Sequence, residues 1–314
     1  SWSFTENYCL SGTGVFLFEA TGSRTPMTCY LCGFPMEFFL KKNGYDIYHC
    51  KKCNLMRTDL HENYETFLHD HYSKGYFTGK QSCGAYIDYK DDKPMIVRNM
   101  KKFIQEIKKH KSGGKLLDVG CAMGFFVELA LQAGFDAYGF DPSEYAVANA
   151  GRLNGHTRII HGAIHTVSYP KKSFDIITLF DVFEHLGDPV RDLRKLYSLL
   201  KDDGILVIAT GNTRSIMAKL LHRRWTFYIP PQHLFFYNRK NLTLLLEKEH
   251  FTPVRWFGIG KWLSLRYVLH LGRTTGESAL AAFFYMLFGR TPLGKFPLYL
   301  PLGDNMVVIA GKKT

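Results

Sequence analysis

An apolar segment that runs into a glycine turn constrains the fold of this chain more than any other feature. Residues 116–124 read Leu-Leu-Asp-Val-Gly-Cys-Ala-Met-Gly, which predicts a buried strand, a tight turn and the start of a helix. A second apolar segment ends in Asp141, 21 positions after Gly120. A carboxylate at that place can accept hydrogen bonds from both hydroxyls of a ribose. The layout is therefore typical of a doubly wound α/β sheet that holds an adenosine-containing cofactor.

Strands and helices alternate from residue 115 onward. Apolar runs predict strands at 116–119, 137–141, 158–160, 174–180, 204–210, 254–259 and 305–311. Helical patterns fall at 124–133, 143–152, 188–200 and 238–250. This alternation predicts a parallel sheet covered by helices on both faces. The segment 260–304 is too long for a turn and should form a helical substructure of its own.

The glycine turn discriminates between cofactors. A nicotinamide dinucleotide requires Gly-x-Gly-x-x-Gly, so that its pyrophosphate lies on the helix N-terminus. Here the turn reads Gly120-Cys-Ala-Met-Gly124. S-adenosylmethionine carries no phosphate, so a wider turn serves it. A plain strand-to-helix turn with an exposed aspartate is the alternative interpretation.

Four motifs together resemble those of the class I S-adenosylmethionine-dependent methyltransferases. They are residues 117–124, Gly139-Phe-Asp-Pro-Ser143, Phe174-Asp-Ile-Ile177 and Asp181-Val-Phe-Glu-His-Leu186. Over about residues 115–260 the chain is most similar to the small-molecule branch that includes the ubiquinone O-methyltransferases. The resemblance implies a Rossmann-like sheet of seven strands, a helical insertion before the last strand, and S-adenosylmethionine as the methyl donor.

The resemblance also implies which residues surround this cofactor. The methionine moiety would be lined by Asp118, Gly120 and Gly124, and the ribose would be held by Asp141. Ala163 and Ile164 would flank the adenine, and Phe180 and Asp181 would lie under the reacting methyl. Three neighbours of these residues belong to the same predicted site: Cys121, Ala122 and Pro142. Ala122 departs from the glycine that is commoner at its position.

Two Cys-x-x-Cys pairs predict a metal centre. Cys29 with Cys32 and Cys50 with Cys53 are separated by seventeen residues, which is the spacing of a four-cysteine zinc ribbon. Four thiolates leave no open position, so the Zn²⁺ should be structural. The odd total of seven cysteines and the lack of a secretory signal favour metal over disulfides. A redox pair or a chance pairing is the alternative. The ribbon resembles the region that precedes the methyltransferase domain in C-methyltransferases of nucleotide-linked deoxysugars.

Two histidine motifs supply catalytic candidates. Methyl transfer is a direct displacement, which requires an aligned acceptor and a base for its proton. The first candidate base is His233, in a segment that looks like the Tyr-x-Glu-His-Leu region of the deoxysugar C-methyltransferases. Gln232 stands in place of the glutamate, which favours O-methylation over C-methylation. Glu184 and His185 follow the strand at 174–180 and rank below His233. The alternative interpretation is that His233 and His185 are packed loop histidines without a catalytic role.

Changes in composition divide the chain into four segments. Residues 1–26 are nearly free of charge and form either a leader before Met27 or an ordered arm. The zinc ribbon takes 27–57, an aromatic and helical lid takes 58–112, and the methyltransferase domain takes 113–314. Tyr72 and Tyr76 belong to the lid. Related enzymes fold such a segment over the cofactor, although these rings could also be core aromatics.

The charge points to an anionic partner without choosing one. The formal net charge is +12, and residues 251–314 hold eight basic and two acidic residues together with eleven aromatic ones. Phosphate, nucleic acid and an acidic membrane surface all fit this balance. The longest apolar stretch, 279–288, is too short to span a bilayer as a helix. The segment 260–304 is therefore either a cap that packs on the sheet or a peripheral helix pair that meets lipid.

Three functions are compatible with these features. The first is a cytoplasmic methyltransferase of a small or medium polar acceptor, such as a sugar of a nucleotide- or lipid-linked glycan. The second is an RNA methyltransferase whose ribbon and basic surface grip the backbone. Against it, the chain lacks the Asn/Asp-Pro-Pro-aromatic motif that holds a flipped base. The third is a non-catalytic module that binds S-adenosylmethionine.

Overall fold

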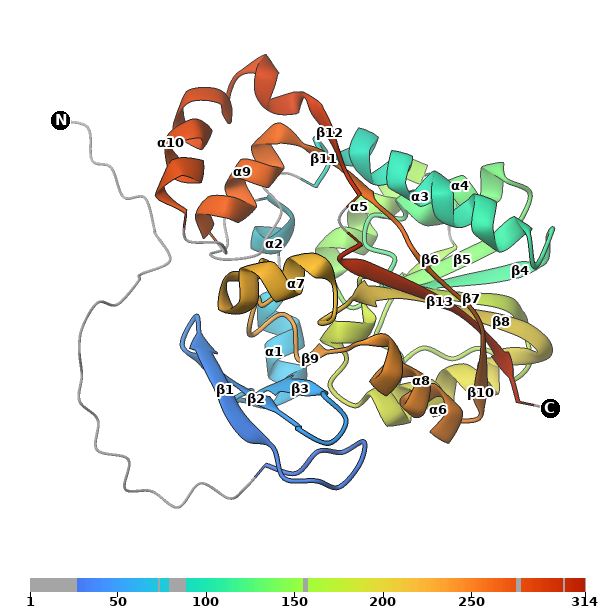
Figure 1. Cartoon of the computed structure of the whole chain (residues 1–314). Helices are drawn as coiled ribbons and strands as arrows, with labels where there is room; N and C mark the ends of the chain where they lie inside the picture. Colours follow the sequence, from blue (N-terminus) through green and yellow to red (C-terminus); the bar gives the residue numbers. More distant parts are fainter. Residues whose placement is uncertain are drawn as a thin grey trace.

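A seven-stranded sheet forms the centre of the computed structural model (Figure 1). Residues 27–72, 74–78, 89–154, 158–274, 278–301 and 303–313 are described; the predicted leader at 1–26 lies outside them. From edge to edge the strands are β10 (Phe251–Gly258), β13 (Asn305–Lys312), β8 (Leu200–Gly211), β7 (Phe174–Phe180), β4 (Lys115–Val119), β5 (Asp136–Asp141) and β6 (Ile159–His161). The predicted Rossmann-like sheet is confirmed.

One strand corrects the prediction of a parallel sheet. β13 pairs antiparallel with both of its neighbours, β8 and β10, whereas the pairs from β8 to β6 are parallel. The chain leaves β10 at Gly258 and enters β13 opposite it, where Gly258 pairs with Met306. Because the chain returns at the same edge, no crossover over a face of the sheet is needed and the strand must run backwards.

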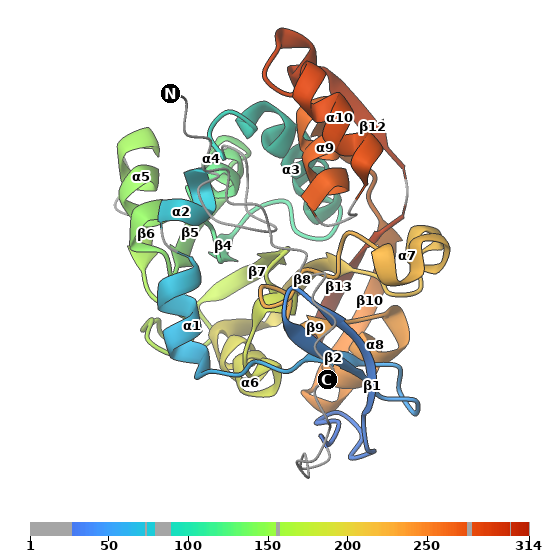
Figure 2. The same ribbon diagram turned by 90° about the vertical axis from the view of Figure 1, so that its left-hand side faces the viewer.

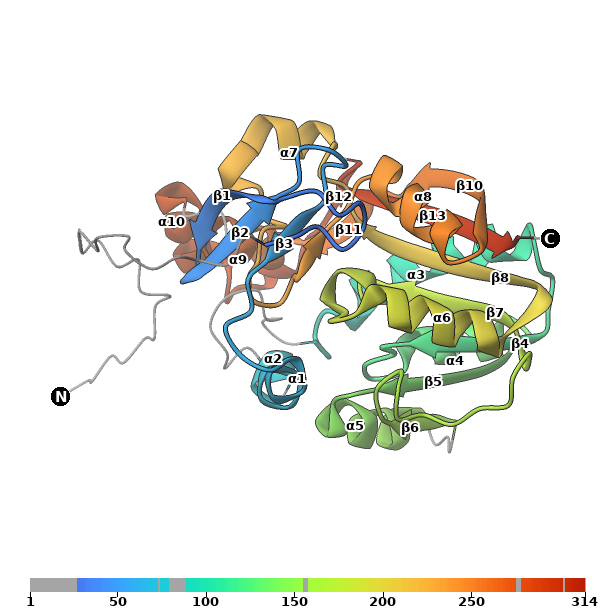
Figure 3. The same ribbon diagram turned by 90° about the horizontal axis from the view of Figure 1, so that it is seen from below.

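Helices cover both faces of the sheet, as predicted. One face is covered by α3 (Lys93–Lys108), α4 (Phe125–Gln132) and α5 (Glu144–Asn154), and the other by α6 (Pro189–Leu199) and α8 (Arg239–Lys248) (Figures 1 and 3). Successive residues of a strand point to opposite faces. Accordingly Ile176 belongs to the core under α3 and α4, and Ile177 to the core under α6 and α8.

The cysteine-rich segment forms a small sheet of its own. Its strands are β1 (Glu37–Lys42), β2 (Tyr45–His49) and β3 (Met56–Thr58), and β3 pairs with β9 (Phe235–Phe236) from the second half of the chain. The pairing with β9 was not predicted. Leu31 and Leu55 lie in the same hydrophobic cluster as the leucines of α6 and α8. The cysteine-rich segment therefore shares a core with the main sheet.

Three short helices lie near the carboxyl edge of the sheet, which faces the viewer in Figure 2. They are α1 (Tyr64–His71), α2 (Lys74–Thr78) and α7 (Ile216–Leu221). α1 starts where the Asn63 side chain accepts the backbone N–H of Glu65, which is a standard N-cap. The Tyr64 hydroxyl donates to the backbone carbonyl of His185 at 3.0 Å. This bond ties α1 to the loop after β7.

Residues 261–300, here called the cap, sit at the edge where β10 ends. The cap contains the antiparallel pair β11 (Lys261–Ser264) and β12 (Pro297–Leu300), with α9 (Leu265–Thr274) and α10 (Ala279–Phe288) between them. The helices were predicted and the two strands were not. Asn99 of α3 exchanges two 2.8 Å hydrogen bonds with the backbone of Trp262. Within the described residues, no helix has the length and apolar character needed to cross a membrane.

Candidate functional site

A cavity of about 420 Å³ opens at the carboxyl edge of the sheet, between the main domain, α1, α2 and the cap. Ligands of open α/β sheets bind at this edge. The cavity is lined by fifteen of the sixteen residues predicted for the cofactor and for catalysis: Tyr72, Tyr76, Asp118, Gly120, Cys121, Ala122, Asp141, Pro142, Ala163, Ile164, Phe180, Asp181, Glu184, His185 and His233. The sixteenth, Gly124, lies behind the turn as the N-cap of α4.

The turn after β4 requires glycine at Gly120. Its φ is +67°, and a Cβ there would lie 2.6 Å from Cγ2 of Val182. Ala122 adopts a φ of +47°, which is left-handed and explains why glycine is commoner at that position. The backbone N–H of Ala122 donates to Oδ2 of Asp141 at 2.8 Å. The carboxylate thus holds the turn in a conformation that alanine disfavours.

Asp141 is buried at the end of β5, facing the same cavity. Its Oδ1 accepts the backbone N–H of Ser143 at 2.9 Å. Each carboxylate oxygen has two acceptor positions, so each retains one after its backbone bond. Burial raises the pKa of Asp141 to about 6, and the group is therefore mostly ionised at pH 7. These two free acceptor positions fit a ligand that presents two neighbouring hydroxyls, as a ribose does.

Two further carboxylates lie along the cavity. Asp118 accepts the Thr178 hydroxyl at 2.7 Å, and burial raises its pKa to about 7. Asp181 has a φ of +53° and is held at 2.8 Å by both Lys261 Nζ and Asn305 Nδ2. The ion pair with Lys261 links the end of β7 to the cap. A sequence motif could not have indicated it, because Lys261 reaches the site only through the unpredicted strand β11.

The remaining wall is largely apolar. Phe180 stacks on Phe103 of α3 with 4.0 Å between ring centroids. Ile164 is buried, and the Ala163 N–H is satisfied by the Thr166 hydroxyl at 2.9 Å. Burial raises the pKa of the Cys121 thiol well above its usual range, so Cys121 is a small apolar residue of the wall at neutral pH.

The two candidate histidines lie together, with ring centroids 4.8 Å apart at an interplanar angle of 75°. Nδ1 of His233 lies 2.7 Å from the Phe227 carbonyl oxygen, and Nδ1 of His185 lies 2.8 Å from the Gln232 carbonyl oxygen. A carbonyl oxygen only accepts, so both Nδ1 atoms carry the proton and both Nε2 atoms carry the lone pair. Burial lowers the pKa of both rings, and they are neutral at pH 7.

Glu184 is fully buried beside these rings. Its Oε2 accepts the Thr210 hydroxyl at 2.7 Å, whereas Oε1 has no partner. Burial, with a smaller effect of the Asp181 charge, raises the pKa of Glu184 to about 8. The ligand atoms of Glu184, His185 and His233 lie within 4.8 Å of one another. Carboxylate and imidazole are also metal ligands, so this is one of two groups in the described residues that could hold an ion.

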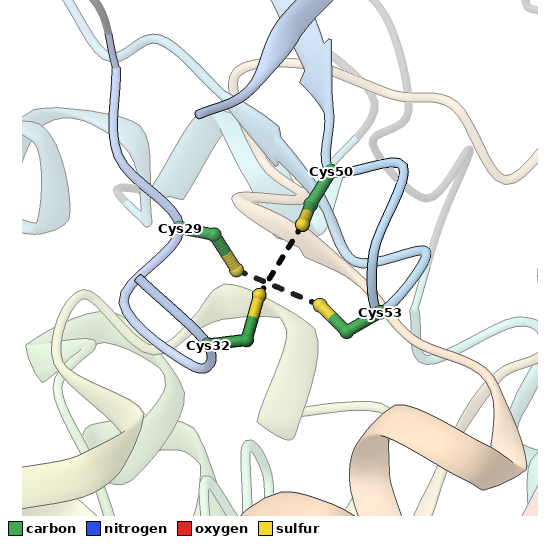
Figure 4. Close-up of side chains that lie close together, drawn as sticks. All are labelled: Cys29, Cys32, Cys50 and Cys53. Atoms are coloured by element: carbon green, nitrogen blue, oxygen red, sulfur yellow. Dashed lines mark hydrogen bonds between the residues drawn. The ribbon is translucent and has the colours of Figure 1, made fainter. Parts of the chain in front are cut away.

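The four cysteines of the two pairs form the other such group. Their sulfur atoms lie within 4.8 Å of one another and point toward a common centre (Figure 4). Sγ of Cys29 is 3.6 Å from that of Cys53, and Sγ of Cys32 is 3.4 Å from that of Cys50. A disulfide needs about 2.05 Å, whereas sulfurs 2.3 Å from one tetrahedral Zn²⁺ are roughly 3.8 Å apart. The arrangement therefore fits a tetrahedral metal centre.

Tyr72 and Tyr76 line the cavity, with ring centroids 5.1 Å apart. The Tyr72 hydroxyl is 2.9 Å from Nδ1 of His185. Sequence reasoning missed several residues of the wall: Tyr89, Phe103, Trp225, Phe227, Lys261, Trp262 and Tyr267. They come from the segment before α3, from α3 itself, from the cap and from residues 225–227, and none of them belongs to a recognised motif. The aromatic character of all but Lys261 was visible in the sequence, but not the convergence of the seven residues on one cavity.

Comparisons with known proteins agree with this geometry. A family model described as a methyltransferase domain matches residues 92–255, just over half of the chain. The mitochondrial ubiquinone biosynthesis O-methyltransferase of Schizosaccharomyces pombe is 33% identical over 117 residues, which are 35% of this chain and 42% of that protein. The match thus spans less than half the length of this curated relative.

Solved structures show the same fold. A methyltransferase in complex with the Trm112 activator of Haloferax volcanii has a TM-score of 0.52 at 13% identity, covering 71% of this chain and 93% of that one. Magnesium protoporphyrin IX methyltransferase from Synechocystis PCC 6803, with bound SAH, has a TM-score of 0.50 at 14% identity, and the match covers 80% of this chain and 100% of that one. The matched family model, the seven-stranded sheet and the glycine turn agree: the chain belongs to the methyltransferase domain family, in its class I, S-adenosylmethionine-dependent form.

Proposed function

We propose that this chain transfers a methyl group from S-adenosylmethionine to a hydroxyl oxygen of a small or medium polar acceptor, with His233 as the base. One observation carries the proposal: Asp141, which can hold a ribose, and His233, a neutral imidazole, line the same cavity. When bound, the cofactor supplies a methyl group on a positively charged sulfur. The chain has to align the acceptor behind that methyl and remove its proton.

The residues at the carboxyl ends of β4 and β5 support the assignment of the donor. The ionised Asp141 would accept the two ribose hydroxyls with the lone pairs that its backbone bonds leave free. Gly120 and Gly124 would bring the backbone of the turn close to the methionine moiety, with Asp118 beside them. Ala163 and Ile164 would flank the adenine, and Tyr72 with Tyr76 would exclude water from above.

The chemistry beside His233 favours oxygen as the methylated atom. Gln232 carries an amide, which cannot accept a proton as a glutamate could, so position 232 supplies no second base beside His233. Methylation of a hydroxyl oxygen needs one base and a positioned hydroxyl, whereas methylation of a carbon requires more catalytic groups to remove its proton. The net charge of +12 suits an acceptor that carries phosphate. A sugar of a nucleotide- or lipid-linked glycan meets both conditions.

We also propose that the chain is organised around a structural Zn²⁺. Residues 27–57 would form the ribbon held by Cys29, Cys32, Cys50 and Cys53, residues 58–112 the lid and linker, and residues 113–314 the methyltransferase domain. The sulfur separations of 3.4 and 3.6 Å support a tetrahedral ion. With all four positions filled by sulfur, such an ion would have no open site for substrate and would act on stability.

Replacement of Asp141 by alanine should weaken donor binding at least about 100-fold, because two hydrogen bonds to a charged group are lost. Isothermal titration calorimetry with S-adenosylmethionine measures this change. Asp136→Ala is the matched control, since Asp136 begins the same strand and is exposed. Equal affinity of wild type and Asp141→Ala would refute the assignment of the donor site.

Donor affinity should also depend on pH. The ionised Asp141 accepts hydroxyl protons, and its pKa is raised to about 6. Below that pH the protonated carboxyl loses acceptor capacity, so the dissociation constant of S-adenosylmethionine should rise as the pH falls from 7 to 5. Calorimetric titrations across this range test the sign. An affinity that is flat, or that improves on acidification, would contradict the role given to Asp141.

The class of acceptor is tested by supplying donor with a labelled methyl group to separated pools of sugar nucleotides, lipid-linked glycans and RNA. Label in a sugar pool, on oxygen, is the expected result. Salt-sensitive labelling of RNA would instead favour an RNA methyltransferase. Donor binding without labelling of any pool would indicate a binding module. Either of these outcomes would overturn the proposed acceptor while leaving the donor site intact.

A further inference from the structure

The helix α10 is apolar on every side and yet buries none of its residues. It reads Ala-Leu-Ala-Ala-Phe-Phe-Tyr-Met-Leu-Phe and contains no charged or buried residue. Leu280 is 66% exposed, Phe283 51% and Met286 71%. A helix that is apolar all round normally lies inside a protein core or in contact with lipid. The interpretation of 260–304 as a cap packed on the sheet therefore does not account for α10.

The exposed apolar surface extends from α10 onto the rest of the cap. Eight of the fourteen large exposed hydrophobic side chains among the described residues lie within 279–300: Leu280, Phe283, Phe284, Met286, Leu287, Leu293, Phe296 and Tyr299. Five of the eight lie on α10, and Leu293 belongs to the segment 292–295, which packs against α10. Single exposed apolar side chains are ordinary, but a group that gathers on one helix and its neighbour marks an interaction surface. Figures 1 and 2 show that α10 lies at the outer end of the cap, away from the sheet. These eight side chains are here called the apolar patch.

Basic residues surround the apolar patch. Arg290 follows Gly289, the C-cap of α10, and is exposed. The Lys295 side chain is 66% exposed, and its Nζ lies 3.7 Å from Oδ2 of Asp91. The guanidinium of Arg273 lies 3.8 Å from the centroid of the Tyr285 ring on α10. Between residues 265 and 300 the chain has four basic residues and one acidic one. One of the four, Arg266, is buried and paired with Asp92. The rim therefore holds Arg273, Arg290 and Lys295, of which Lys295 is exposed but pairs with Asp91.

We propose that the apolar patch docks on an anionic lipid surface, with α10 in the boundary between the headgroups and the acyl chains. An apolar face with aromatic residues and a rim of Lys and Arg is the composition that binds such surfaces. A second copy of this chain is less suited to the patch, because a two-fold interface would bring the same cations against one another. The contact requires no spanning segment, since α10 has only ten residues.

The docking surface is separated from the cavity by one helix, α9. Trp262 and Leu263 of β11, with Tyr267 and Leu271 of α9, line the cavity from the cap side, while α10 packs along α9. A protein docked through α10 would thus hold its active site next to the lipid surface. The inference does not depend on the proposed acceptor, because binding to lipid is measured without any acceptor or donor.

The full chain is tested by flotation with vesicles of phosphatidylcholine alone and with 30% phosphatidylserine (about one anionic lipid in three). We expect binding to the anionic vesicles. Phe283→Ser combined with Met286→Ser should lower the partition coefficient at least about tenfold. Arg290→Gln combined with Lys295→Gln should lower it roughly 30-fold on anionic vesicles, with little change on neutral ones. Phe38→Ser combined with Val254→Ser is the matched control, since both side chains are exposed apolar residues outside the cap, Phe38 in β1 and Val254 in β10.

Calorimetry with S-adenosylmethionine shows whether each variant is folded, because none of the substituted residues lines the cavity. A wild type that does not bind anionic vesicles would overturn the inference, as would a control variant that loses as much binding as the Phe283 and Met286 variant. A third outcome is also decisive. If analytical ultracentrifugation shows the wild type as a dimer and the variant with Phe283→Ser and Met286→Ser as a monomer, and if vesicle binding is unchanged in that variant, the patch is an interface between copies of the chain.

Discussion

Replacing Cys50 with serine should lower the free energy of unfolding of the whole chain by more than about 5 kcal/mol. Cys29 and Cys50 are only 1% and 0% exposed. If they are thiolates, four negative sulfurs are kept together by the ion alone, and removal of one ligand weakens or expels it. The ribbon has too few residues for a core of its own, so after loss of the ion it would be ordered only by the core that it shares with the main sheet.

The damage should spread beyond the ribbon. Leu31 and Leu55 are buried with the leucines of α8, β3 pairs with β9, and Lys248 of α8 donates to the backbone carbonyl of Leu31. Unfolding of the ribbon would expose this shared core. We therefore expect one cooperative transition at a lower denaturant concentration, and weakened binding of S-adenosylmethionine, rather than loss of the ribbon alone.

Denaturant titration together with elemental analysis of the purified protein measures these effects. Cys121→Ala is the matched control, because Cys121 is also buried but lies outside the cluster; its cost should stay below about 1.5 kcal/mol. Treatment of the wild type with a chelator should reproduce the effect of Cys50→Ser. A wild type that contains no zinc, or a Cys50→Ser shift no larger than that of Cys121→Ala, would contradict the structural metal.

The strands of the main sheet could be predicted because each depends on a local apolar run. The apolar run that ends in Phe180 and the one from 204 to 210 form strands that are buried on both faces. Such strands can be recognised in the sequence because they are almost continuously apolar. The direction of β13 and the pairing of β9 with β3 could not be predicted in this way. Both depend on where the chain returns after a long excursion, which no local pattern encodes.

In the candidate site too, the residues that depend on a local pattern could be predicted, and those that depend on a long-range contact could not. The turn at Gly120 and the carboxylate at Asp141 follow from the geometry of one strand-turn-helix unit and its neighbour, so their spacing predicted them. Lys261 reaches Asp181 only because the cap folds back over the edge of the sheet. Ala122 is an intermediate case: its departure from glycine was visible in the sequence, but the compensating hydrogen bond to Asp141 was not.

His233→Gln should lower kcat by a factor of about 10² to 10⁴, which is the usual contribution of a positioned base. The Phe227 carbonyl fixes the proton on Nδ1 of His233 and leaves the lone pair on Nε2. Glutamine is of similar size and polarity but does not accept a proton at neutral pH. The variant should therefore bind S-adenosylmethionine within about twofold of the wild type. Its defect should lie in the chemical step.

The pH profile separates a base from a merely structural histidine. Burial, with a smaller contribution from the nearby His185, lowers the pKa of His233 well below 6.5. A base must be unprotonated. With S-adenosylmethionine kept saturating, so that protonation of Asp141 does not enter, kcat/KM of the wild type for the acceptor should be flat above pH 6.5 and fall only at more acidic pH, and this limb should vanish in His233→Gln. His185→Gln is the matched control and should cost about tenfold or less, because His185 ranks below His233 as a base. An equal loss in both variants, or a loss that a divalent cation restores, would mean that the two rings position or ligate rather than accept the proton of the acceptor.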